Sequence, residues 1–537
     1  MEQFSRSGIP LKDYYNHDDI RHTGAGDAAK PGEYPYARGR RARAQAAGGW
    51  IQRELSGEGE PSKSNGQIKY LLGKGQMGID IIGDSPTMAM LDPDHPLAAN
   101  AVGTQGVSLC CLDDYLELFR DIPLDSISIS SSLPSIFGLA GLYLAAKNAG
   151  VPPGKLRGSV IQAPFYSEDC GYATHMPFDL RVRLAADVME FCAAEMPKFH
   201  SYVEDTYFIS ETGLTAVEEM ALGFVEIRYL VRELLRRGVP IDSFAPRIAI
   251  LVNCSMDFFE EIAKIRAIRR LFARMMKDEF GAQDPRSRSV VITSHTSGLS
   301  LTAQQPFNNI VRGAIQALAL VLGGVQALEI SAFDEAYRTP SHESHLVGLR
   351  TQQVIDLETG VTKVVDPLGG SYYLEFLTGE MERRIWEMVQ DIEARGDLAA
   401  LSDKGFFRGI FQNAVERYSR QVSDGEVKVV GVNAHQLPPE EDTLLKEVAE
   451  RKISPCREHI LKIKAFKENR DIGKVKHALR RLYAQALSRD LNLVPAVIEA
   501  TEANATMGEM AGTLRMAYGY PYDPYRLIQP LEGGLDR

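Results

Sequence analysis

Short apolar segments alternate with longer amphipathic segments from about residue 67 onward. The apolar segments with the length and composition of strands are MGIDIIG (77–83), SISIS (126–130), GSVIQA (158–163), DTYFIS (205–210), RIAILVN (247–253), SVVITS (289–294) and VQALEIS (325–331). The segments between them, such as residues 256–280, are apolar at positions i, i+3, i+4 and i+7, which indicates helices with one buried face. This alternation predicts repeated βα units around a parallel sheet.

A further strand is expected near residue 365, in the sequence KVVDP. Together these units fit a (β/α)8 TIM barrel, so the predicted fold class is α/β with that barrel as its body. A doubly wound open sheet is the alternative, because a local pattern does not show whether a sheet closes.

The two ends of the chain differ from this repeating body. Residues 1–60 are rich in Gly, Arg, Ala and Asp and show little periodicity, which predicts an extended N-terminal arm. Residues 61–400 form the predicted barrel domain, and residues 401–537 a helical C-terminal extension. Within this extension, residues 440–453 and 474–487 have the pattern of amphipathic helices.

Composition narrows the function classes. The formal net charge is −11, and a general nucleic-acid binder would need a basic face, so we expect no nucleic-acid partner. No apolar run approaches the roughly 18 residues of a membrane helix, so no membrane partner is expected. The N-terminal residues are polar and lack the apolar core of a signal peptide. We therefore predict a cytoplasmic protein.

The cysteines do not form a recognisable metal or disulfide pattern. They stand at positions 110, 111, 170, 192, 254 and 456, without a CxxC spacing. Cys110 and Cys111 are adjacent, which favours neither a zinc site nor a disulfide framework. Buried free thiols in a reducing compartment are the expected state, and no metal site is predicted.

Several short segments occur in the order typical of one enzyme family. They are YPYARG (34–39), LLGKGQMGI (71–79), DSPT (84–87), FAPR (244–247), FFEEIAKIRAIRRL (258–271), TSGLSLTAQQPFNNIVR (296–312), FDEA (333–336), RTQQ (350–353), DPLGGSYYLE (366–375), GVN (431–433) and ATMGEM (505–510). From about Tyr34 to its C-terminal region, the chain resembles the large, substrate-binding subunits of the methylmalonyl-CoA mutase family. In architecture it is nearest to the large subunits of isobutyryl-CoA and 2-hydroxyisobutyryl-CoA mutases.

The resemblance implies an isomerase that uses adenosylcobalamin for a radical rearrangement of an acyl-CoA carbon skeleton. The CoA arm would enter the barrel at one end, and the corrin would cover the other. Cobalamin modules of the family carry Asp-x-His-x-x-Gly, and the nearest segment here is Glu343-Ser-His345-Leu-Val-Gly348, interpreted as an ordinary helix face. We therefore expect no cobalamin-binding domain in this chain. A separate small subunit would hold the cobalamin, with self-association into a heterotetramer.

The resemblance also implies which residues act on the acyl group. Gln162 takes the place of the family glutamine that contacts this group, and Tyr207 that of the tyrosine facing the cobalamin. Phe208 stands where the family has a histidine that donates to the thioester carbonyl. Leu55 replaces an active-site aromatic residue, and Asp80 is a candidate partner for a substrate hydroxyl.

Cofactor and CoA contacts are assigned in the same way. Glu335 is the expected ligand of the adenosyl ribose, and the other expected cofactor contacts are His295, Gln326 and Ser331. For the CoA phosphates and pantetheine the resemblance implies Arg53, Arg247 and Arg286, while Arg41 and Arg43 of the arm are further candidates, since guanidinium groups suit phosphates.

Departures from the family pattern bear on the substrate. Methylmalonyl-CoA mutases bind the substrate carboxylate with an arginine whose place here falls on Gly171 or Tyr172. We therefore expect a short, non-dicarboxylic acyl-CoA that is branched or hydroxylated. One alternative is a methylmalonyl-CoA mutase proper that uses Arg181 instead. Another, motivated by Phe208, is a catalytically silent binding or assembly subunit of the same fold.

Overall fold

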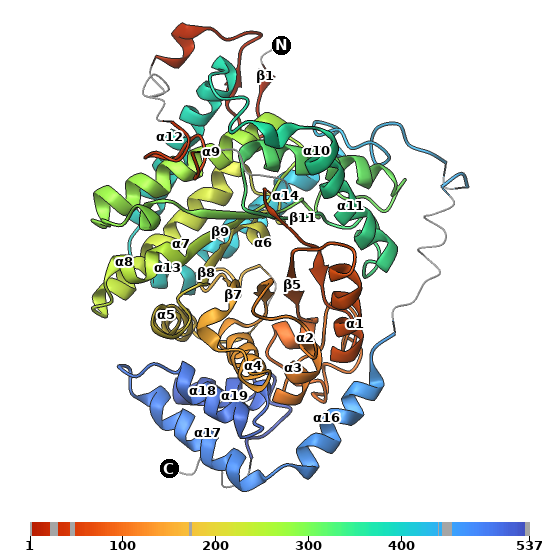
Figure 1. The fold of residues 1–537 in the computed structure, drawn as a ribbon, viewed down its shortest axis with the longest axis vertical. Helices are drawn as coiled ribbons and strands as arrows, with labels where there is room; N and C mark the ends of the chain where they lie inside the picture. Colours follow the sequence, from red (N-terminus) through yellow and green to blue (C-terminus); the bar gives the residue numbers. More distant parts are fainter. Residues whose placement is uncertain are drawn as a thin grey trace. The chain divides into compact units, whose positions relative to one another are not determined.

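The computed structural model describes residues 3–21, 30–42, 49–170, 174–438, 440–442 and 454–531. The chain divides into two compact units (Figure 1). Unit 1 consists of Met1–Glu54 and Glu204–Arg451, and unit 2 consists of Leu55–Val203 and Lys452–Arg537.

The strands of unit 1 form a parallel arrangement in the order β3-β11-β10-β9. Their bounds are β3 (Ile51–Gln52), β9 (Ile248–Val252), β10 (Val291–His295) and β11 (Ala327–Glu329). The register places Thr293 opposite Ala327 and His295 opposite Glu329. A separate antiparallel hairpin joins β1 (Gln3–Phe4) and β2 (Pro10–Leu11).

Helices of unit 1, both long and short, lie beside these strands. Their bounds are α6 (Thr206–Ser210), α7 (Ala216–Arg236), α8 (Ile241–Phe244), α9 (Phe258–Arg274), α10 (Asn308–Gly323), α11 (His342–Glu358), α12 (Tyr372–Ala394), α13 (Leu398–Asp403) and α14 (Phe406–Ser423). In Figure 1, α12 runs close to α7 and α9, with which it makes extensive contacts. The start of α7 is fixed by a capping box, in which Thr215 and Glu218 bond each other's backbone amides.

The strands of unit 2 are also parallel, in the order β4-β5-β6-β7. Their bounds are β4 (Leu55–Ser56), β5 (Gly78–Ile82), β6 (Ser128–Ser132) and β7 (Arg157–Gln162). The strand β8 (Phe199–Asp205) follows β7 in the sheet, and its last two residues belong to unit 1.

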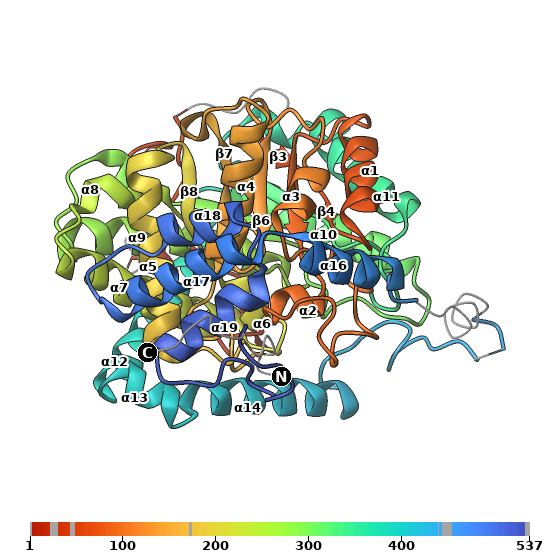
Figure 2. The same cartoon turned by 90° about the horizontal axis from the view of Figure 1, so that it is seen from below.

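Helices from both ends of unit 2 enclose one apolar core. They are α1 (Pro61–Leu72), α2 (Ser85–Met88), α3 (Leu112–Leu118), α4 (Ser135–Asn148), α5 (Phe178–Glu195), α16 (Arg457–Asn469), α17 (Ile472–Leu487), α18 (Val494–Glu502) and α19 (Met507–Ala517). Figure 2 shows α18 over α4, where Val497 and Leu139 belong to the same buried cluster. The burial of these apolar side chains is what joins the C-terminal helices to the strands of unit 2.

The predicted α/β class, with βα repeats as in a TIM-like barrel and a helical C-terminal extension, is confirmed. The helix predicted over 474–487 is α17, whereas most of the helix predicted over 440–453 lies outside the described residues. Among the described residues, none of the helices combines the length and the apolar character that a membrane span requires.

Two predicted strands were wrong. The segment near 365 contains only a short turn, Val361–Lys363, and Asp366 adopts a left-handed backbone with φ 49°, which a strand does not accommodate. The segment 205–210 is the end of β8 followed by α6, because Asp205 accepts a hydrogen bond from the Phe208 amide and starts a helix there.

Besides β8, the strands missing from the prediction lie in the arm. β3 and β4 are two residues each and are separated only by Arg53 and Glu54. β3 pairs with β11 in unit 1, and β4 pairs with β5 in unit 2. A two-residue strand is too short to show an alternating pattern, so the sequence analysis included this segment in an extended arm.

Candidate active site

A buried chain of charged side chains lies at the carboxyl ends of β10 and β11. His295 Nε2 is 2.9 Å from Glu329 Oε2, and Arg53 Nε is 2.5 Å from the other oxygen of the same carboxylate. Arg53 also donates from Nη2 to Thr293 Oγ1 at 3.0 Å. The side chains of Arg53 and Glu329 are each 3% exposed. The structure thus places Arg53 inside a buried ion pair, although a phosphate contact was expected of it.

Tyr207, on α6, lies against this chain. Its ring centroid is 4.7 Å from that of His295, and the two rings are inclined by 58°. Burial raises the pKa of Tyr207 well above its ordinary value, Glu211 and Glu335 raise it further, and a hydrogen bond with Ser331 acts in the opposite sense. The phenol therefore stays protonated at neutral pH and keeps a hydrogen-bond donor in the site.

The loop after β10 holds a second carboxylate close to Tyr207. Glu211 accepts hydrogen bonds from Ser297 Oγ at 2.9 Å and from the Leu299 amide at 2.5 Å. A Cβ atom on Gly298 would lie 2.9 Å from Glu211 Oε2 and 3.3 Å from the Tyr207 hydroxyl oxygen. The loop thus needs glycine here to let the backbone approach both side chains.

Glu335 and Ser331 follow β11 and complete this group. Glu335 Oε2 accepts a hydrogen bond from the Ala332 amide at 3.0 Å, and the Ser331 hydroxyl donates to the Thr296 carbonyl at 2.7 Å. Burial raises the pKa of Glu335 to about 7, against the lowering effect of His295. Near neutral pH this carboxyl group can therefore either donate or accept a hydrogen bond.

Sequence reasoning missed Glu54 and Gln352, which lie next to Arg53. Gln352 donates from Nε2 to the Arg53 carbonyl at 3.0 Å and to Glu54 Oε1 at 3.1 Å, and its own oxygen accepts from Trp50 Nε1 at 3.0 Å. Burial raises the pKa of Glu54 well above its ordinary value. The signal was present in the sequence, because WIQREL places polar residues, Arg53 and Glu54 among them, between Ile51 and Leu55. The segment RTQQ contains Gln352, which supplies the amide.

The segment that resembles a cobalt-binding motif lies on α11. His345 and Gly348 are buried there, and a Cβ atom on Gly348 would lie 2.7 Å from Glu54 Oε2. The predicted helix is confirmed, but the face that carries these two residues packs inside unit 1 rather than facing solvent.

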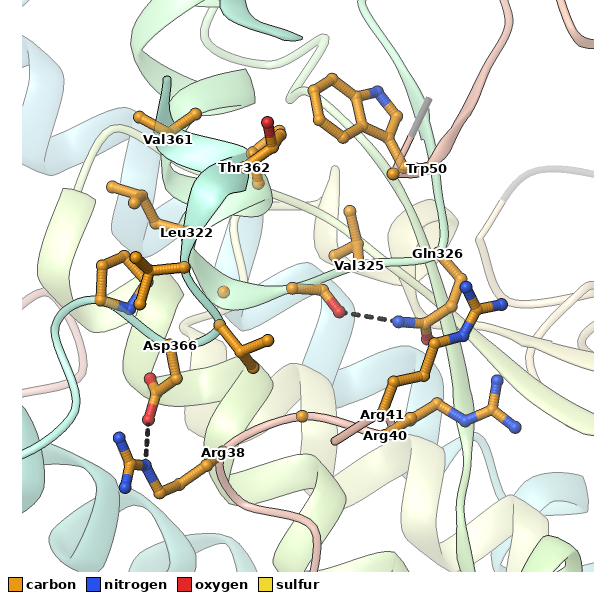
Figure 3. Close-up of a pocket in the computed structure, with 18 of the residues that line it drawn as sticks. Arg38, Arg40, Arg41, Trp50, Leu322, Val325, Gln326, Val361, Thr362 and Asp366 are labelled. Atoms are coloured by element: carbon orange, nitrogen blue, oxygen red, sulfur yellow. Dashed lines mark hydrogen bonds and ion pairs between the residues drawn. The ribbon is translucent and has the colours of Figure 1, made fainter. Parts of the chain in front are cut away.

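A basic pocket lies at the amino ends of β3 and β11 (Figure 3). Its volume is about 90 Å³, and Arg38, Arg40, Arg41 and Arg269 line it together with the end of α10. Arg38 Nε is 2.8 Å from Asp366 Oδ2. Burial lowers the pKa of Arg40 to about 10, and the like charge of Arg41 lowers it further. An anion in this pocket would relieve that repulsion.

Gln326, an expected cofactor contact, lies in the wall of this pocket and not with Glu335. Its Nε2 donates to the Gly324 carbonyl at 2.7 Å, and its Oε1 accepts from the Ile292 amide at 2.9 Å. The residue directly precedes β11, whereas Glu329 is the last residue of that strand. The structure therefore brings His295, Ser331 and Glu335 together and separates Gln326 from them.

The remaining arginines expected at CoA differ in exposure. Arg286 is 75% exposed and lies 2.6 Å from Asp284. Burial lowers the pKa of Arg247, and the charge of Arg286 lowers it further, so these two guanidinium groups lie near each other. Arg41 is exposed at the basic pocket, and Arg43 lies outside the described residues.

The other predicted residues lie on the strands of unit 2, except Phe208, which is partly buried on α6 of unit 1. Leu55 and Asp80 are register partners on β4 and β5, and Ser132 Oγ donates to Asp80 at 3.3 Å. Gln162 ends β7 and donates to the Ser201 carbonyl at 2.8 Å. Its amide is thereby oriented before any substrate binds.

Arg181, the alternative carboxylate ligand, donates instead to backbone carbonyls. Its guanidinium bonds the carbonyls of Phe165, at 2.9 Å, and Pro164. Gly171 and Tyr172, where the family arginine would fall, lie outside the described residues.

Comparison with known proteins gives one consistent result. The family model described as methylmalonyl-CoA mutase matches residues 4–520. The large subunit of 2-hydroxyisobutanoyl-CoA mutase from Aquincola tertiaricarbonis is 35% identical over 528 residues, covering 96% of this chain and 92% of that protein. Methylmalonyl-CoA mutase from Rhizobium meliloti is 36% identical over 517 residues, covering 95% of this chain and 72% of that protein.

The human mitochondrial methylmalonyl-CoA mutase is 33% identical over 517 residues, covering 95% of this chain and 68% of that protein. These matches extend over both units and include the segments that carry Tyr207, His295 and Glu335. The chain therefore belongs to the methylmalonyl-CoA mutase family, whose members named here are CoA mutases and thus isomerases.

Proposed function

We propose that this chain is the substrate-binding large subunit of an adenosylcobalamin-dependent acyl-CoA mutase that acts in the cytoplasm. The observation that carries the proposal is the presence of two unlike sites at opposite ends of the same strands of unit 1. A basic pocket lies where β3 and β11 begin, and a buried polar group lies where β10 and β11 end. A long ligand with an anionic end and a reactive acyl end fits such a pair of sites.

The basic pocket supports the binding of the phosphate end of CoA. Arg40 and Arg41 are crowded by each other's charge, while Arg38 is already paired with Asp366. Phosphate oxygens would accept hydrogen bonds from Arg40 and Arg41. The carboxylate in the described pocket lining, Asp366, is the one already paired with Arg38. Arg247 and Arg286 remain further candidates for this end.

The polar group at the other end fits a cofactor that carries a ribose. Glu335, whose pKa is raised to about 7, would hold ribose hydroxyl groups, and Ser331 lies beside it. When bound, adenosylcobalamin supplies the carbon radical that starts the rearrangement. His295 is buried, Tyr207 is partly buried, and the packing of their rings helps to exclude water from this place.

The electrostatics favour a substrate without a second carboxylate. Arg53 is neutralised by Glu329 at 2.5 Å, and Arg181 is committed to backbone carbonyls. Glu54 and Glu211 add further carboxyl groups near the same strand ends. A carboxylate on the acyl group would thus find Arg53 and Arg181 already engaged, and we propose a short acyl-CoA that is branched or hydroxylated. Gln162, Leu55 and Asp80 of unit 2 are the proposed acyl contacts.

The proposed assembly is a heterotetramer in which a separate small subunit holds most of the cobalamin. In this chain the segment nearest to a cobalt-binding motif has its histidine, His345, buried on α11 beside Gly348 and Glu54. That packing supports a structural role for His345 and a cobalt ligand from another chain.

The test is reconstitution of the full chain with the small subunit and adenosylcobalamin. Isobutyryl-, 2-hydroxyisobutyryl-, methylmalonyl- and longer acyl-CoAs are offered, and rearranged products are measured by mass spectrometry together with the visible spectrum of the cobalamin. Product from a non-dicarboxylic substrate supports the proposal. Turnover of methylmalonyl-CoA alone contradicts the substrate class and favours the mutase that uses Arg181.

A second outcome concerns the silent subunit that Phe208 suggests, since phenylalanine has no hydrogen-bond donor for a thioester carbonyl. If no substrate gives product and none changes the cobalamin spectrum, the catalytically silent subunit is favoured. Glu335→Gln is the matched variant for the cofactor end, with Arg383→Ala, on an exposed turn of α12, as the control. Loss of the spectral change in the first variant alone supports the assignment of Glu335.

A further inference from the structure

Two cysteines, an aspartate and a histidine form a buried cluster in unit 2. Cys110 and Cys111 directly precede α3, Asp114 lies in its first turn, and His459 lies on α16. Each of the four residues is at most 2% exposed. Both sulfur atoms and a carboxylate oxygen of Asp114 lie within 4.8 Å of one another. His459 Nε2 lies 3.8 Å from Asp114 Oδ2.

One face of α16 packs against the two cysteines. Ile463 forms a small apolar cluster with Cys110 and Cys111, and Phe466 covers that cluster. His459 precedes Ile463 by four residues, and residues so spaced lie on the same face of a helix. The imidazole therefore lies on the face of α16 that covers the two thiols.

Several polar atoms of the cluster lack a hydrogen-bond partner among the described residues. They are both ring nitrogens of His459 and Oδ1 of Asp114. Buried polar atoms are nearly always paired, and each one left unpaired costs about 1–3 kcal/mol. The distance of 3.8 Å between His459 Nε2 and Asp114 Oδ2 is too long for a hydrogen bond. A ligand between these side chains would satisfy them.

The backbone cap at α3 accounts for only part of these groups. Asp114 Oδ2 accepts from the amides of Cys110 at 2.9 Å and Cys111 at 3.3 Å, and the Cys111 sulfur accepts from the Asp114 amide. This cap leaves the second carboxylate oxygen and the imidazole unused. A sulfur atom that accepts an amide hydrogen bond can still bind a metal, as ligand sulfurs in proteins commonly do.

We propose that Cys110, Cys111, Asp114 and His459 bind one zinc ion or a similar thiophilic divalent cation. Two sulfurs, one imidazole nitrogen and one carboxylate oxygen are a donor set that zinc accepts in tetrahedral geometry. Nitrogen and oxygen ligands about 2 Å from a tetrahedral zinc lie about 3.3 Å apart, and His459 Nε2 lies 3.8 Å from Asp114 Oδ2, the oxygen that also caps α3. His459 is not part of the group whose ligand atoms lie within 4.8 Å of one another, so its imidazole would move toward the thiols when the ion binds.

Binding exchanges protons for the metal. Burial raises the pKa of Cys110 well above its ordinary value, so without metal its thiol is protonated, and the pKa of Cys111 is raised as well. One divalent cation thus displaces two thiol protons and joins one carboxylate and one neutral imidazole. Four protein ligands leave no open position, so the ion is structural and ties α16 to the start of α3.

The test uses the full-length chain, freed of metal by a chelator and titrated with Co²⁺ under reducing conditions. The expected result is one Co²⁺ per chain with thiolate-to-metal absorption in the near ultraviolet, visible bands of tetrahedral cobalt, and release of two protons. Zn²⁺ then displaces the Co²⁺. The absence of thiolate-to-metal absorption would overturn the proposal. A chain whose mass shows a disulfide between Cys110 and Cys111, and which binds no metal, would overturn it as well.

Variants locate the ion. Cys110→Ser and His459→Gln are expected to weaken Co²⁺ binding at least about ten-fold and to change the visible bands. Cys192→Ser is the matched control, because Cys192 is a buried cysteine of α5 in the same unit. Equal loss in this control would contradict the assignment. The titration of the unaltered chain decides the question even where a variant does not fold.

Discussion

The rings of Tyr207 and His295 pack against each other at 4.7 Å between centroids and an angle of 58°. His295 is held from its other side by Glu329, at 2.9 Å from Nε2. The imidazole cannot rotate away from Tyr207 without breaking its contact with Glu329. The position of the phenol in the candidate active site therefore depends on a carboxylate that does not touch it.

Glu329→Gln tests this dependence. The variant leaves the Arg53 guanidinium buried without its counter-charge, and loss of one partner of a buried ion pair costs about 3–5 kcal/mol. We expect the free energy of unfolding, measured by urea denaturation, to fall by that order. Glu387→Gln on α12 removes an exposed pair with Arg383 and is expected to cost less than about 0.5 kcal/mol. Similar losses in the two variants would contradict the role given to Glu329.

Gly348→Ala tests the packing of Glu54 against α11. The new Cβ atom would lie 2.7 Å from Glu54 Oε2, and this carboxyl group is buried and held by Gln352. We expect a net loss of about 1–2 kcal/mol, because overpacking exceeds the gain in helix propensity. Gly409→Ala on α14 meets nothing within 4 Å and is expected to gain about 0.5–1 kcal/mol. Thermal melting of both variants measures the difference, and a stabilised Gly348→Ala would refute the contact.

Glu335 is expected to make stability depend on pH. Its pKa is raised from the ordinary 4.5 to about 7 in the folded chain, so the folded state binds more protons than the unfolded state between these values. The contribution of Glu335 to the free energy of unfolding is complete below pH 4.5 and is lost as the pH rises through about 7.

In Glu335→Gln this loss should disappear. The slope of the unfolding free energy between pH 5 and 7 should then be shallower by up to about 1.4 kcal/mol per pH unit. Glu54 and Glu211, whose pKa values are also raised by burial, keep part of the slope in the variant. An unchanged slope would show that Glu335 does not titrate in this range.

Arg40→Ala tests the basic pocket. Loss of one guanidinium contact to a phosphate costs about 1–2 kcal/mol, so the dissociation constant of CoA, measured by calorimetry, should rise about ten-fold. Arg383→Ala removes an arginine from an exposed face of α12 and should leave CoA binding unchanged. Arg286 is exposed beside Asp284 and does not line the basic pocket. Arg286→Ala should therefore leave CoA binding unchanged if the phosphates bind in the basic pocket, and should weaken it if they bind near Arg247 and Arg286.

Much of the fold could be predicted because most strands are apolar runs bounded by turns. RIAILVN gives β9, and the helix after it has a regular apolar face. The errors have local causes. Asp205 caps a helix inside a segment of strand-like composition, and Asp366 adopts a left-handed backbone within KVVDP. Two-residue strands such as β3 depend on pairing with β11 and carry no pattern of their own.

The site could be predicted in part, and only through the family resemblance. Tyr207, His295 and Glu335 do lie together, but the sequence contains no sign that Glu329 contacts both Arg53 and His295. That role follows from the register of β10 and β11, which places His295 opposite Glu329. Likewise, adjacent Cys110 and Cys111 look like free thiols until folding brings His459 to Asp114 from far along the chain.

The basic pocket takes one wall from the N-terminal arm, where Arg38 is anchored to Asp366 and Arg40 donates to Ser289. A ligand that bridges Arg40 and the end of α10 would fasten the arm to the body of unit 1. By thermodynamic linkage, at a concentration one hundred times its dissociation constant, such a ligand would add about 2.7 kcal/mol to stability. The melting temperature of the purified protein would then report CoA occupancy, and protease resistance of residues 30–42 would rise with it.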